Sequence, residues 1–395
     1  MKKKSSPKLE DAPKTLESSP VEAAQTEAVE SADNKQNKVN KLEFMHSRLI
    51  PNWMMQNKVS IAFSTYNTNR LFMLGIGPKG QVTLNSQSYP RCMGLWASPD
   101  AQTIVMSNML QILRLEAAQD VSLTKKGVDR IYVPRVGFTT GDSDIHDVSV
   151  GSDNRPIFVN TLYSCLATVS TKYSFIPIWK PSFISKLAPE DRCHLNGLAM
   201  VDGKPRYVTC VANSDVSDGW RDHRADGGLV IDITTNEVVA SGLAMPHSPR
   251  FHNGKLWVHN SGKGEFGYVD LEKRKFVPIT FCPGYLRGLS FVGDFAVVGM
   301  SLSRHNCNFA NLPLEQELKK RNAEARCGIQ IIDLNNGNVV HGIRMGGSVQ
   351  ELYDVVVLNG VKNPMAAGFG KNDLPFLLNP PPMNTLTEKS EQEKM

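Results

Sequence analysis

Short runs of apolar residues recur along this chain, each bounded by Gly, Asn, Asp or Pro. Examples lie at residues 60–66, 103–107, 207–211 and 295–300, where Val, Ile, Phe and Tyr are frequent. Such runs, bounded by turn-forming residues, are typical of β-strands. Only residues 314–325, rich in Glu, Leu, Lys and Ala, have the composition of a good helix. The pattern therefore predicts an all-β fold.

A five-residue segment with an apolar fifth position occurs six times. The copies begin at Arg91, Asp144, His194, His247, Tyr285 and Glu351. Their third positions lie 38 to 66 residues apart, and a four-stranded propeller blade takes roughly 40–50 residues. Several copies are followed by a hairpin turn signal, such as Asp202-Gly203 or Asn253-Gly254. We therefore expect a β-propeller in which each segment opens a blade.

The two ends of this repeat array predict how the ring closes. Strands expected at residues 59–90 precede the first segment and lack an inner strand. The unit that begins at Glu351 has one or two strands before the chain ends. Joining these N- and C-terminal strands closes a ring of six blades. Seven blades would result if the two parts stayed separate, and a pair of β-sandwiches is the alternative fold.

Composition sets the expected boundaries of the folded part. Residues 1–45 are rich in Lys, Glu, Ser, Pro and Ala and almost without aromatics. They can bury too little apolar surface to offset the entropy of ordering, so we expect a disordered tail. A single propeller domain is expected over residues 50–375. Residues 379–395 contain three consecutive prolines and many charges, which predicts a flexible tail.

Composition also limits the expected partners and location. The net charge of +5 comes largely from dispersed lysines, so a nucleic-acid partner is not expected. A membrane partner is not expected either, because no apolar run approaches the 18 or so residues of a membrane helix. The seven cysteines are odd in number and widely spaced. No apolar segment follows the lysines after Met1, and together these features favour a reducing, cytoplasmic location.

The expected connections differ in length between the two faces of the ring. The first hairpin turn of each blade, such as residues 202–205 or 253–255, is minimal, and so are the turns at 234–237 and 335–338. Long or polar connections are expected at 137–147, 181–196, 213–228 and 301–328. Because all of these long connections fall on one face, we expect the site there. The alternative is that these loops have changed in length without acquiring a function.

Four motifs lie on that loop-rich face. They are Gly-Asp-Ser-Asp-Ile-His-Asp at 141–147, Glu-Asp-Arg-Cys-His-Leu-Asn-Gly at 190–197, Met-Pro-His-Ser-Pro-Arg at 245–250 and Pro-Gly-Tyr-Leu-Arg-Gly at 283–288. Together they resemble a family of bacterial conserved hypothetical proteins, some of which carry tetratricopeptide repeats. The resemblance covers about residues 50–370 and implies no activity.

A second, more distant resemblance concerns residues 194–198, His-Leu-Asn-Gly-Leu. They are similar to the Asn-Gly motif of the six-bladed gluconolactonase and strictosidine-synthase-like propellers. That resemblance implies that Asn196 binds a divalent metal at the centre of the ring. Cys210 stands where those enzymes often have a metal-binding Asp, which departs from their pattern.

Three histidines are expected at the mouth of the axial channel. His146, His194 and His247 occupy first or third positions of their segments, where the inner strands begin. Imidazole exchanges protons near neutral pH, so these are the candidate catalytic residues. Asp144 and Glu351 occupy equivalent first positions and, with Asn196, are the candidate metal ligands. Hydrogen bonding of these side chains to loop backbone is the alternative.

Arg250, Arg287, Tyr353 and Trp220 are the candidate ligand-binding residues. An Arg binds a carboxylate or phosphate through two parallel hydrogen bonds, so Arg250 and Arg287 favour an anionic ligand. Pairing with acidic residues of neighbouring blades is the alternative for both. Trp220 lies in a charged loop, where it either stacks on a ligand or folds back as a structural plug.

Three functions fit these features. The first is a propeller that binds a small anionic or carbohydrate-like molecule in a polar axial pocket, with or without a metal. The second is a metal-dependent hydrolase or lactonase. The third is a protein-interaction platform, which an extended apolar patch would favour. Fold alone does not decide among them, and whether the protein is an enzyme stays open.

Overall fold

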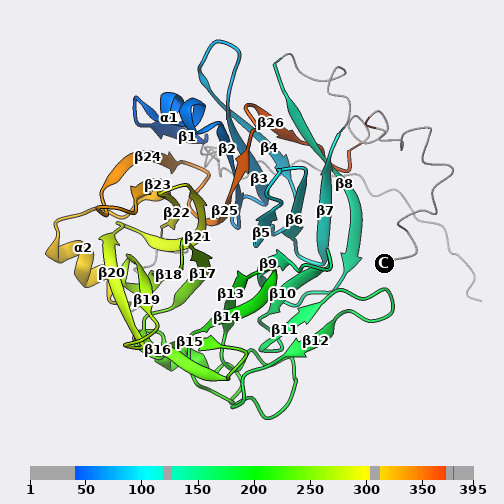
Figure 1. The fold of residues 1–395 in the computed structure, drawn as a ribbon, viewed down its shortest axis with the longest axis vertical. Helices are drawn as coiled ribbons and strands as arrows, with labels where there is room; N and C mark the ends of the chain where they lie inside the picture. Colours follow the sequence, from blue (N-terminus) through cyan, green and yellow to red (C-terminus); the bar gives the residue numbers. More distant parts are fainter. Residues whose placement is uncertain (1–40, 119–126, 303–311, 371–376, 378–395) are drawn as a thin grey trace, which may run out of the picture. The chain divides into compact units, whose positions relative to one another are not determined.

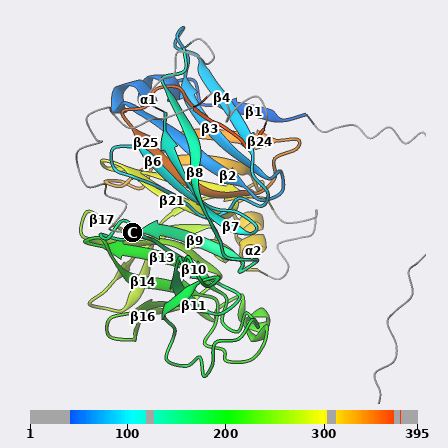
Figure 2. The ribbon, with the colours of Figure 1, turned by 90° about the vertical axis from the view of Figure 1, so that its right-hand side faces the viewer.

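The computed structural model describes residues 41–118, 127–302, 312–370 and 377. Its strands form six sheets arranged as blades around a central axis, so the chain folds as a six-bladed β-propeller (Figure 1). The predicted fold is confirmed, and the seven-bladed and sandwich alternatives are wrong. Figure 2 shows the ring from its side, with β2–β4 near one end and β16 near the other.

Blades are numbered here after the six repeated segments in chain order. Blades 2, 3 and 4 each contain four consecutive antiparallel strands, β9–β12, β13–β16 and β17–β20. In order, these twelve strands are Ile145–Val150, Pro156–Asn160, Cys165–Thr168, Ile176–Trp179, Leu195–Val201, Lys204–Cys210, Gly228–Asp232, Glu237–Leu243, Pro246–His252, Lys255–Asn260, Glu265–Asp270 and Lys275–Phe281.

Blades 1 and 5 carry a fifth strand on their outer edge. Blade 1 contains β5–β8 and is extended by β26, which runs parallel to β8. Blade 5 contains β21–β24 and is extended by β1, antiparallel to β24. In order, β5–β8, β26, β21–β24 and β1 are Leu95–Ala97, Thr103–Ser107, Gln111–Ala117, Arg130–Thr139, Pro364–Ala366, Tyr285–Val292, Phe295–Ser301, Cys327–Asp333, Val339–Gly346 and Glu43–His46.

Blade 6 closes the ring with strands from both ends of the chain. Its inner strand is β25 (Leu352–Asn359), which pairs antiparallel with β2 (Val59–Thr65). The blade continues outward through β3 (Arg70–Ile76) and β4 (Val82–Ser88). The predicted closure by N- and C-terminal strands is therefore confirmed.

Each junction between neighbouring blades has its own apolar core. All seven residues of β2 are buried, because one face of its blade packs on blade 5 and the other on blade 1. The remaining junctions are filled in the same way by the inner and middle strands of adjacent blades. Burial on both faces explains why the strands read as short continuous apolar runs rather than as alternating patterns.

The predicted hairpin turns between the first two strands of a blade are confirmed. Asp202 and Gly203 have φ angles of 50° and 70°, and Asn253 and Gly254 have 48° and 74°, which is the backbone of a two-residue hairpin turn. The prediction that all surplus sequence lies on one face is wrong. The β11–β12 connection, residues 169–175, lies on the other face. It lies at the outer rim, where a loop can grow without meeting another blade.

The helices differ from expectation. Helix α2 (Leu314–Lys320) is shorter than predicted, because Asn322 takes a left-handed φ of 47° just beyond it. Helix α1 (Ile50–Asn57) was not predicted, since its two turns contain few strong helix formers. β1 also begins at Glu43, inside the segment expected to be disordered; the rest of that segment and the predicted C-terminal tail lie outside the described residues. Within the described residues, no helix has the length and apolar character to cross a membrane.

Candidate functional site

The inner strands of three blades begin with the same backbone turn. Arg91, Asp144 and His194, the first positions of their segments, have φ angles of 46°, 50° and 49°. This left-handed conformation is uncommon and costs energy for residues other than Gly, and such strain is frequent at functional sites. The turn ends the incoming loop and places equivalent side chains of different blades at the same level of the channel.

Six side chains meet at the loop-rich mouth of the channel, and we call them the mouth cluster. The rings of His146 and His194 lie 4.7 Å apart between centroids, and those of His146 and His247 lie 6.4 Å apart. The Tyr353 ring lies 5.7 Å from the His146 ring. The cluster comprises His146, His194, His247, Tyr285, Arg287 and Tyr353. The structure thus brings together the three predicted histidines and two of the four predicted ligand-binding residues.

His146 is anchored through one ring nitrogen. Its Nδ1 lies 2.8 Å from the carbonyl oxygen of Asp144 and 2.9 Å from the Thr161 hydroxyl. Because Thr161 donates its own proton to the carbonyl of Leu195 at 2.6 Å, both partners of His146 act as acceptors. The proton of His146 therefore sits on Nδ1, which leaves Nε2 as an acceptor.

The other two histidines are anchored in the same way. His247 Nδ1 lies 2.9 Å from the carbonyl oxygen of Met245, and His194 Nδ1 lies 2.8 Å from Asp191 Oδ2. Each of these contacts requires Nδ1–H as the donor. The buried Nε2 of His247 has no hydrogen-bond partner among the described residues. The mouth therefore presents three imidazoles that are each anchored through Nδ1–H, which leaves Nε2 for other partners.

Burial keeps two of these imidazoles uncharged. It lowers the pKa of His146 to about 4. Burial, followed by the nearby charge of Arg287, lowers the pKa of His247 well below its ordinary value. Removing an ion from water without a compensating charge is costly, so both side chains are neutral at pH 7. A neutral imidazole accepts a hydrogen bond from a ligand hydroxyl, which an imidazolium cannot do.

Arg287 is the buried cation of the mouth cluster. Its guanidinium carbon lies 5.2 Å from the Tyr285 ring centroid and 4.7 Å from that of Tyr353. The side chain is 8% exposed, its Nε has no hydrogen-bond partner, and no acidic residue pairs with it among the described residues. Stacking on aromatic rings offsets part of the cost of burying the charge. The guanidinium still has donors for an anion.

Trp220 is placed against the histidines by its side-chain contacts. Its ring stacks on His194, with 4.1 Å between centroids and 27° between planes. Its Nε1–H donates to the same Asp191 oxygen that His194 contacts, at 2.9 Å. Leu314 and Leu318 of α2 pack in the same apolar cluster as Trp220. Trp220 and α2 therefore cover one side of the mouth, and stacking of Trp220 on a ligand stays a prediction.

The expected metal ligands have other partners. Asn196 accepts a hydrogen bond from the Thr209 hydroxyl at 2.7 Å, and the backbone N–H of Glu351 donates to Asn67 Oδ1 at 3.2 Å. The carboxylate of Asp144 lies 3.7 Å from His146 Nδ1. Within the described residues, no three His, Cys, Asp or Glu side chains lie close enough to hold a metal ion. The divalent-metal site stays a prediction.

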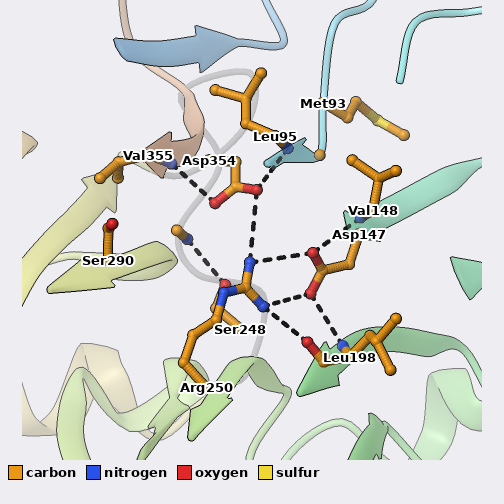
Figure 3. Close-up of polar contacts among 12 residues, drawn as sticks. Met93, Leu95, Asp147, Val148, Leu198, Ser248, Arg250, Ser290, Asp354 and Val355 are labelled. Atoms are coloured by element: carbon orange, nitrogen blue, oxygen red, sulfur yellow. Dashed lines mark hydrogen bonds and ion pairs between the residues drawn. The ribbon is translucent and has the colours of Figure 1, made fainter. Parts of the chain in front are cut away.

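Arg250 lies deeper in the channel, where it pairs with two aspartates (Figure 3). Its two terminal nitrogens lie 2.7 and 3.1 Å from the carboxylate oxygens of Asp147, and one lies 3.7 Å from Asp354 Oδ2. The guanidinium also donates to the carbonyls of Leu198 and Pro249 at 3.0 Å. We call Arg250, Asp147 and Asp354 the plug. Binding of a ligand by Arg250 stays a prediction.

The plug connects the inward-facing edges of the inner strands. Asp147 accepts from the backbone N–H of Val148 and Leu198 at 2.9 and 3.0 Å. Asp354 accepts from the N–H of Leu95 and Val355, each at 2.8 Å. An inner strand pairs on one edge only, so its other edge leaves backbone groups unpaired along the axis. The carboxylates supply acceptors to four inner strands, which makes the plug a structural element.

The plug occupies the fourth position of the repeated segments, which the sequence analysis passed over. Glycine fills this position in the other three blades. A Cβ on Gly94 would lie 2.9 Å from the Asp147 backbone, and one on Gly288, whose φ is +75°, would lie 2.6 Å from the Val355 nitrogen. Only Gly permits this approach of neighbouring inner strands. Comparing the fourth positions, Gly94, Asp147, Gly197, Arg250, Gly288 and Asp354, would have revealed it.

Two further residues of the site were missed. Tyr285 stands at the first position of its segment but was not among the candidate ligand-binding residues. Asp191 lies three residues before His194, a spacing that means little until the loop brings the two side chains to 2.8 Å. The left-handed φ of Asp191, 40°, reverses the loop there.

Residues 48–367 match the family model described as "Domain of unknown function (DUF4915)". A search of curated protein sequences finds no match to the chain. Among solved structures, one from a nidogen/laminin complex is similar, with a TM-score of 0.47, 8% identity and coverage of 77% of this chain and 99% of that one. A protein of unknown function from Bacteroides caccae has a TM-score of 0.45 and 10% identity, with coverage of 76% of this chain and 98% of that one. Virginiamycin B lyase from Staphylococcus aureus has a TM-score of 0.35 and 10% identity, with coverage of 77% of this chain and 99% of that one.

Proposed function

The chain belongs to the DUF4915 family, and we propose that its propeller binds a small hydroxylated anion, a sugar acid or a sugar phosphate, in the mouth cluster. The observation that carries the proposal is Arg287, a buried guanidinium without an acidic partner among the described residues. An unpaired buried charge is expensive, and a bound carboxylate or phosphate offsets that cost. The charge of the ligand is therefore negative.

The histidines define the rest of the ligand. His146 and His247 are neutral and each has Nδ1–H bound to protein, so their Nε2 atoms accept hydrogen bonds. The matching groups on a ligand are hydroxyls, which donate to these nitrogens while the anionic end binds Arg287. The rings of Tyr285 and Tyr353 flank the guanidinium and provide apolar faces for the carbon skeleton of a sugar.

The test compares charged and neutral sugars. Gluconate and glucose 6-phosphate are titrated into the full chain by isothermal titration calorimetry, with glucose and acetate as comparators. We expect both sugar anions to bind, and glucose and acetate to bind at least tenfold more weakly. Glucose lacks the anionic group that binds Arg287, and acetate lacks the hydroxyls that donate to the histidines. Equal binding of glucose and gluconate would contradict a role for the charge.

A matched pair of variants assigns the binding to Arg287. Arg287→Met removes the charge but keeps an unbranched side chain between the two Tyr rings, and we expect the Kd for gluconate to rise at least tenfold. Arg221→Met is the control, because Arg221 lies on the same face with its side chain 59% exposed. Its Kd should equal that of the parent protein. Unchanged binding by a folded Arg287→Met protein would exclude the mouth cluster as the site.

The two other functions expected from the sequence stay predictions. A metal-dependent hydrolase would need a metal site that the described residues do not assemble. The contact of His194 with Asp191 suits proton transfer, because a carboxylate orients an imidazole and stabilises its protonated form. A protein-interaction platform is less favoured at this face, since the mouth cluster is polar and buried.

A further inference from the structure

A cavity of about 250 Å³ lies in the channel on the far side of the plug from the mouth cluster. Its walls come from the fifth to seventh positions of the repeated segments, whereas the mouth cluster comes from the first and third. All six inner strands contribute, from Leu95 in blade 1 to Val357 in blade 6. The cavity therefore belongs to the face with the short first hairpin turns, and nothing in the sequence motifs points to it.

Aromatic and aliphatic side chains form the walls. Trp96, Phe251 and Phe291, from three different blades, line the cavity together with Met200 and Leu289, and Ser149 and Ser290 add two hydroxyls. Phe251 is 36% exposed, so the cavity opens to solvent at this end. Apolar walls with aromatic faces favour a flat, apolar ligand body, which loses its contact with water on entry.

Arg250 provides the polar end of the cavity. Its side chain is 21% exposed and lines the cavity, while Asp147 and Asp354 are each 4% exposed. The terminal nitrogens of Arg250 bind carboxylate and carbonyl oxygens. Its Nε–H has no acceptor among the described residues. This N–H is therefore a charged hydrogen-bond donor at the inner end, in addition to the hydroxyls of Ser149 and Ser290 that also line the cavity.

The charge around this donor disfavours an anion. Asp147 and Asp354 together carry two negative charges when ionised, against one positive charge on Arg250. A carboxylate entering the cavity would meet a net negative plug in a poorly solvated channel, where repulsion is strong. The group that matches Nε–H is therefore an uncharged acceptor oxygen.

We propose that this cavity is a second binding site, for an uncharged single-ring aromatic molecule that carries one acceptor oxygen. The ring lies between Trp96, Phe251 and Phe291, and the oxygen accepts from Arg250 Nε–H. Size supports one ring, because a cavity of about 150 Å³ holds benzene and this one has room for a substituent as well. The site is separate from the sugar-anion site, since the plug lies between them.

Benzamide and benzoate test the proposal, since they share a shape and differ in charge. Each is titrated into the full chain at pH 8, with binding followed by ligand-observed NMR. We expect saturable binding of benzamide and at least tenfold weaker binding of benzoate. Absence of saturable benzamide binding at millimolar concentration, or equal binding of benzoate, would overturn the proposal.

Cavity-filling variants locate the binding. Ala97→Phe places a ring in the cavity from blade 1, and we expect it to weaken benzamide binding at least tenfold. Ala117→Phe makes the same change on β7 of that blade, outside the cavity, and should leave binding unchanged. If Ala97→Phe does not fold, Met200→Trp fills the cavity from blade 3. Binding that survives in a folded filling variant would refute this site.

The same measurements separate the two sites. Arg287→Met should leave benzamide binding unchanged, and Ala97→Phe should leave gluconate binding unchanged. If benzamide binds and gluconate does not, the proposed function is overturned and the second site is kept. If gluconate binds and benzamide does not, the second site is overturned and the proposed function is kept. Loss of benzamide binding in a folded Arg287→Met protein would show that benzamide occupies the mouth cluster instead.

Discussion

Arg250 shows how one residue type takes different roles at neighbouring levels of the channel. Arg250 and Arg287 were both expected to bind an anionic ligand. Arg250 pairs with Asp147 at 2.7 Å and is enclosed by the plug, whereas Arg287 has two Tyr rings and no acid among the described residues. Arg287 stands at the third position of its repeated segment and Arg250 at the fourth, so a step of one residue separates a mouth residue from a plug residue. Sequence spacing alone does not reveal the partners.

The plug predicts a large effect of one substitution. Arg250→Met removes the cation that lies between the buried carboxyls of Asp147 and Asp354. Breaking a buried ion pair from one side costs about 3–5 kcal/mol, and we expect that loss in the free energy of unfolding, measured by urea denaturation. Arg221→Met, on an exposed side chain, should change it by less than about 0.5 kcal/mol. A loss below about 1 kcal/mol for Arg250→Met would show that the plug does not stabilise the ring.

Asp354 predicts a pH dependence. Burial raises the pKa of its carboxyl from the ordinary value of 3.8 to about 7, against the opposing charge of Arg250. Between about pH 4 and pH 7 the folded protein holds a proton that the unfolded chain releases, so this group makes stability fall as pH rises. Asp354→Asn cannot titrate and should remove that fall.

The measurement is the difference in unfolding free energy between parent and Asp354→Asn across pH 4 to 7.5. Burial lowers the pKa values of His146 and His259 to about 4. These two groups act in the opposite direction, because the unfolded chain takes up protons at them as the pH falls and stability therefore falls toward low pH. They are present in both proteins and cancel in the difference. A difference that does not vary with pH would show that the carboxyl of Asp354 titrates normally.

At the scale of elements, the blades are joined by more than their apolar junctions. Hydroxyls near the end of second strands donate to the inner strand of the next blade: Ser107 to Ile145 at 3.0 Å and Ser301 to Leu352 at 2.6 Å. Ser64 of β2 does the same across the closing junction, to Met93 at 2.5 Å. These polar links and the plug both engage the inner strands, where the blades come closest.

Closure of the ring depends on β25, so a truncation that removes β25 should abolish ring closure. A chain that ends after Val349 lacks the inner strand of blade 6, which pairs with β2 along its length. It also lacks Asp354 and the acceptor for Ser301. We expect no cooperative thermal unfolding and aggregation in size-exclusion chromatography. Truncation after Leu378, which keeps every described residue, is the control and should retain the Tm of the full chain. Cooperative unfolding of the shorter chain would contradict closure by β25.

For the whole molecule, the channel is the organising feature. The plug divides it into a polar mouth cluster on the loop-rich face and a cavity lined largely by aromatic and aliphatic side chains on the other. The loop-length argument directed attention to one face alone. The described connections correct it in part, since residues 169–175 add length to the opposite face. The two proposed sites differ in ligand charge because one has an unpaired Arg and the other a paired one.

The sequence by itself predicted the propeller fold and the joining of its two ends that gives six blades, and it left seven blades as an alternative. These depend on local runs of apolar residues and on a repeat whose period matches a blade, both of which can be read without distances. It also identified the histidines and Arg287, because equivalent repeat positions must lie at the same level of a ring.

Only the tertiary structure decided what each side chain does. Whether an Arg is paired depends on atoms such as those of Arg250 and Asp147, which are 103 residues apart in the chain. The cavity exists because apolar walls from six strands fail to meet along the axis, and no single segment records that gap. Pairing and empty space are properties of distances between distant residues, so they follow from the folded ring alone.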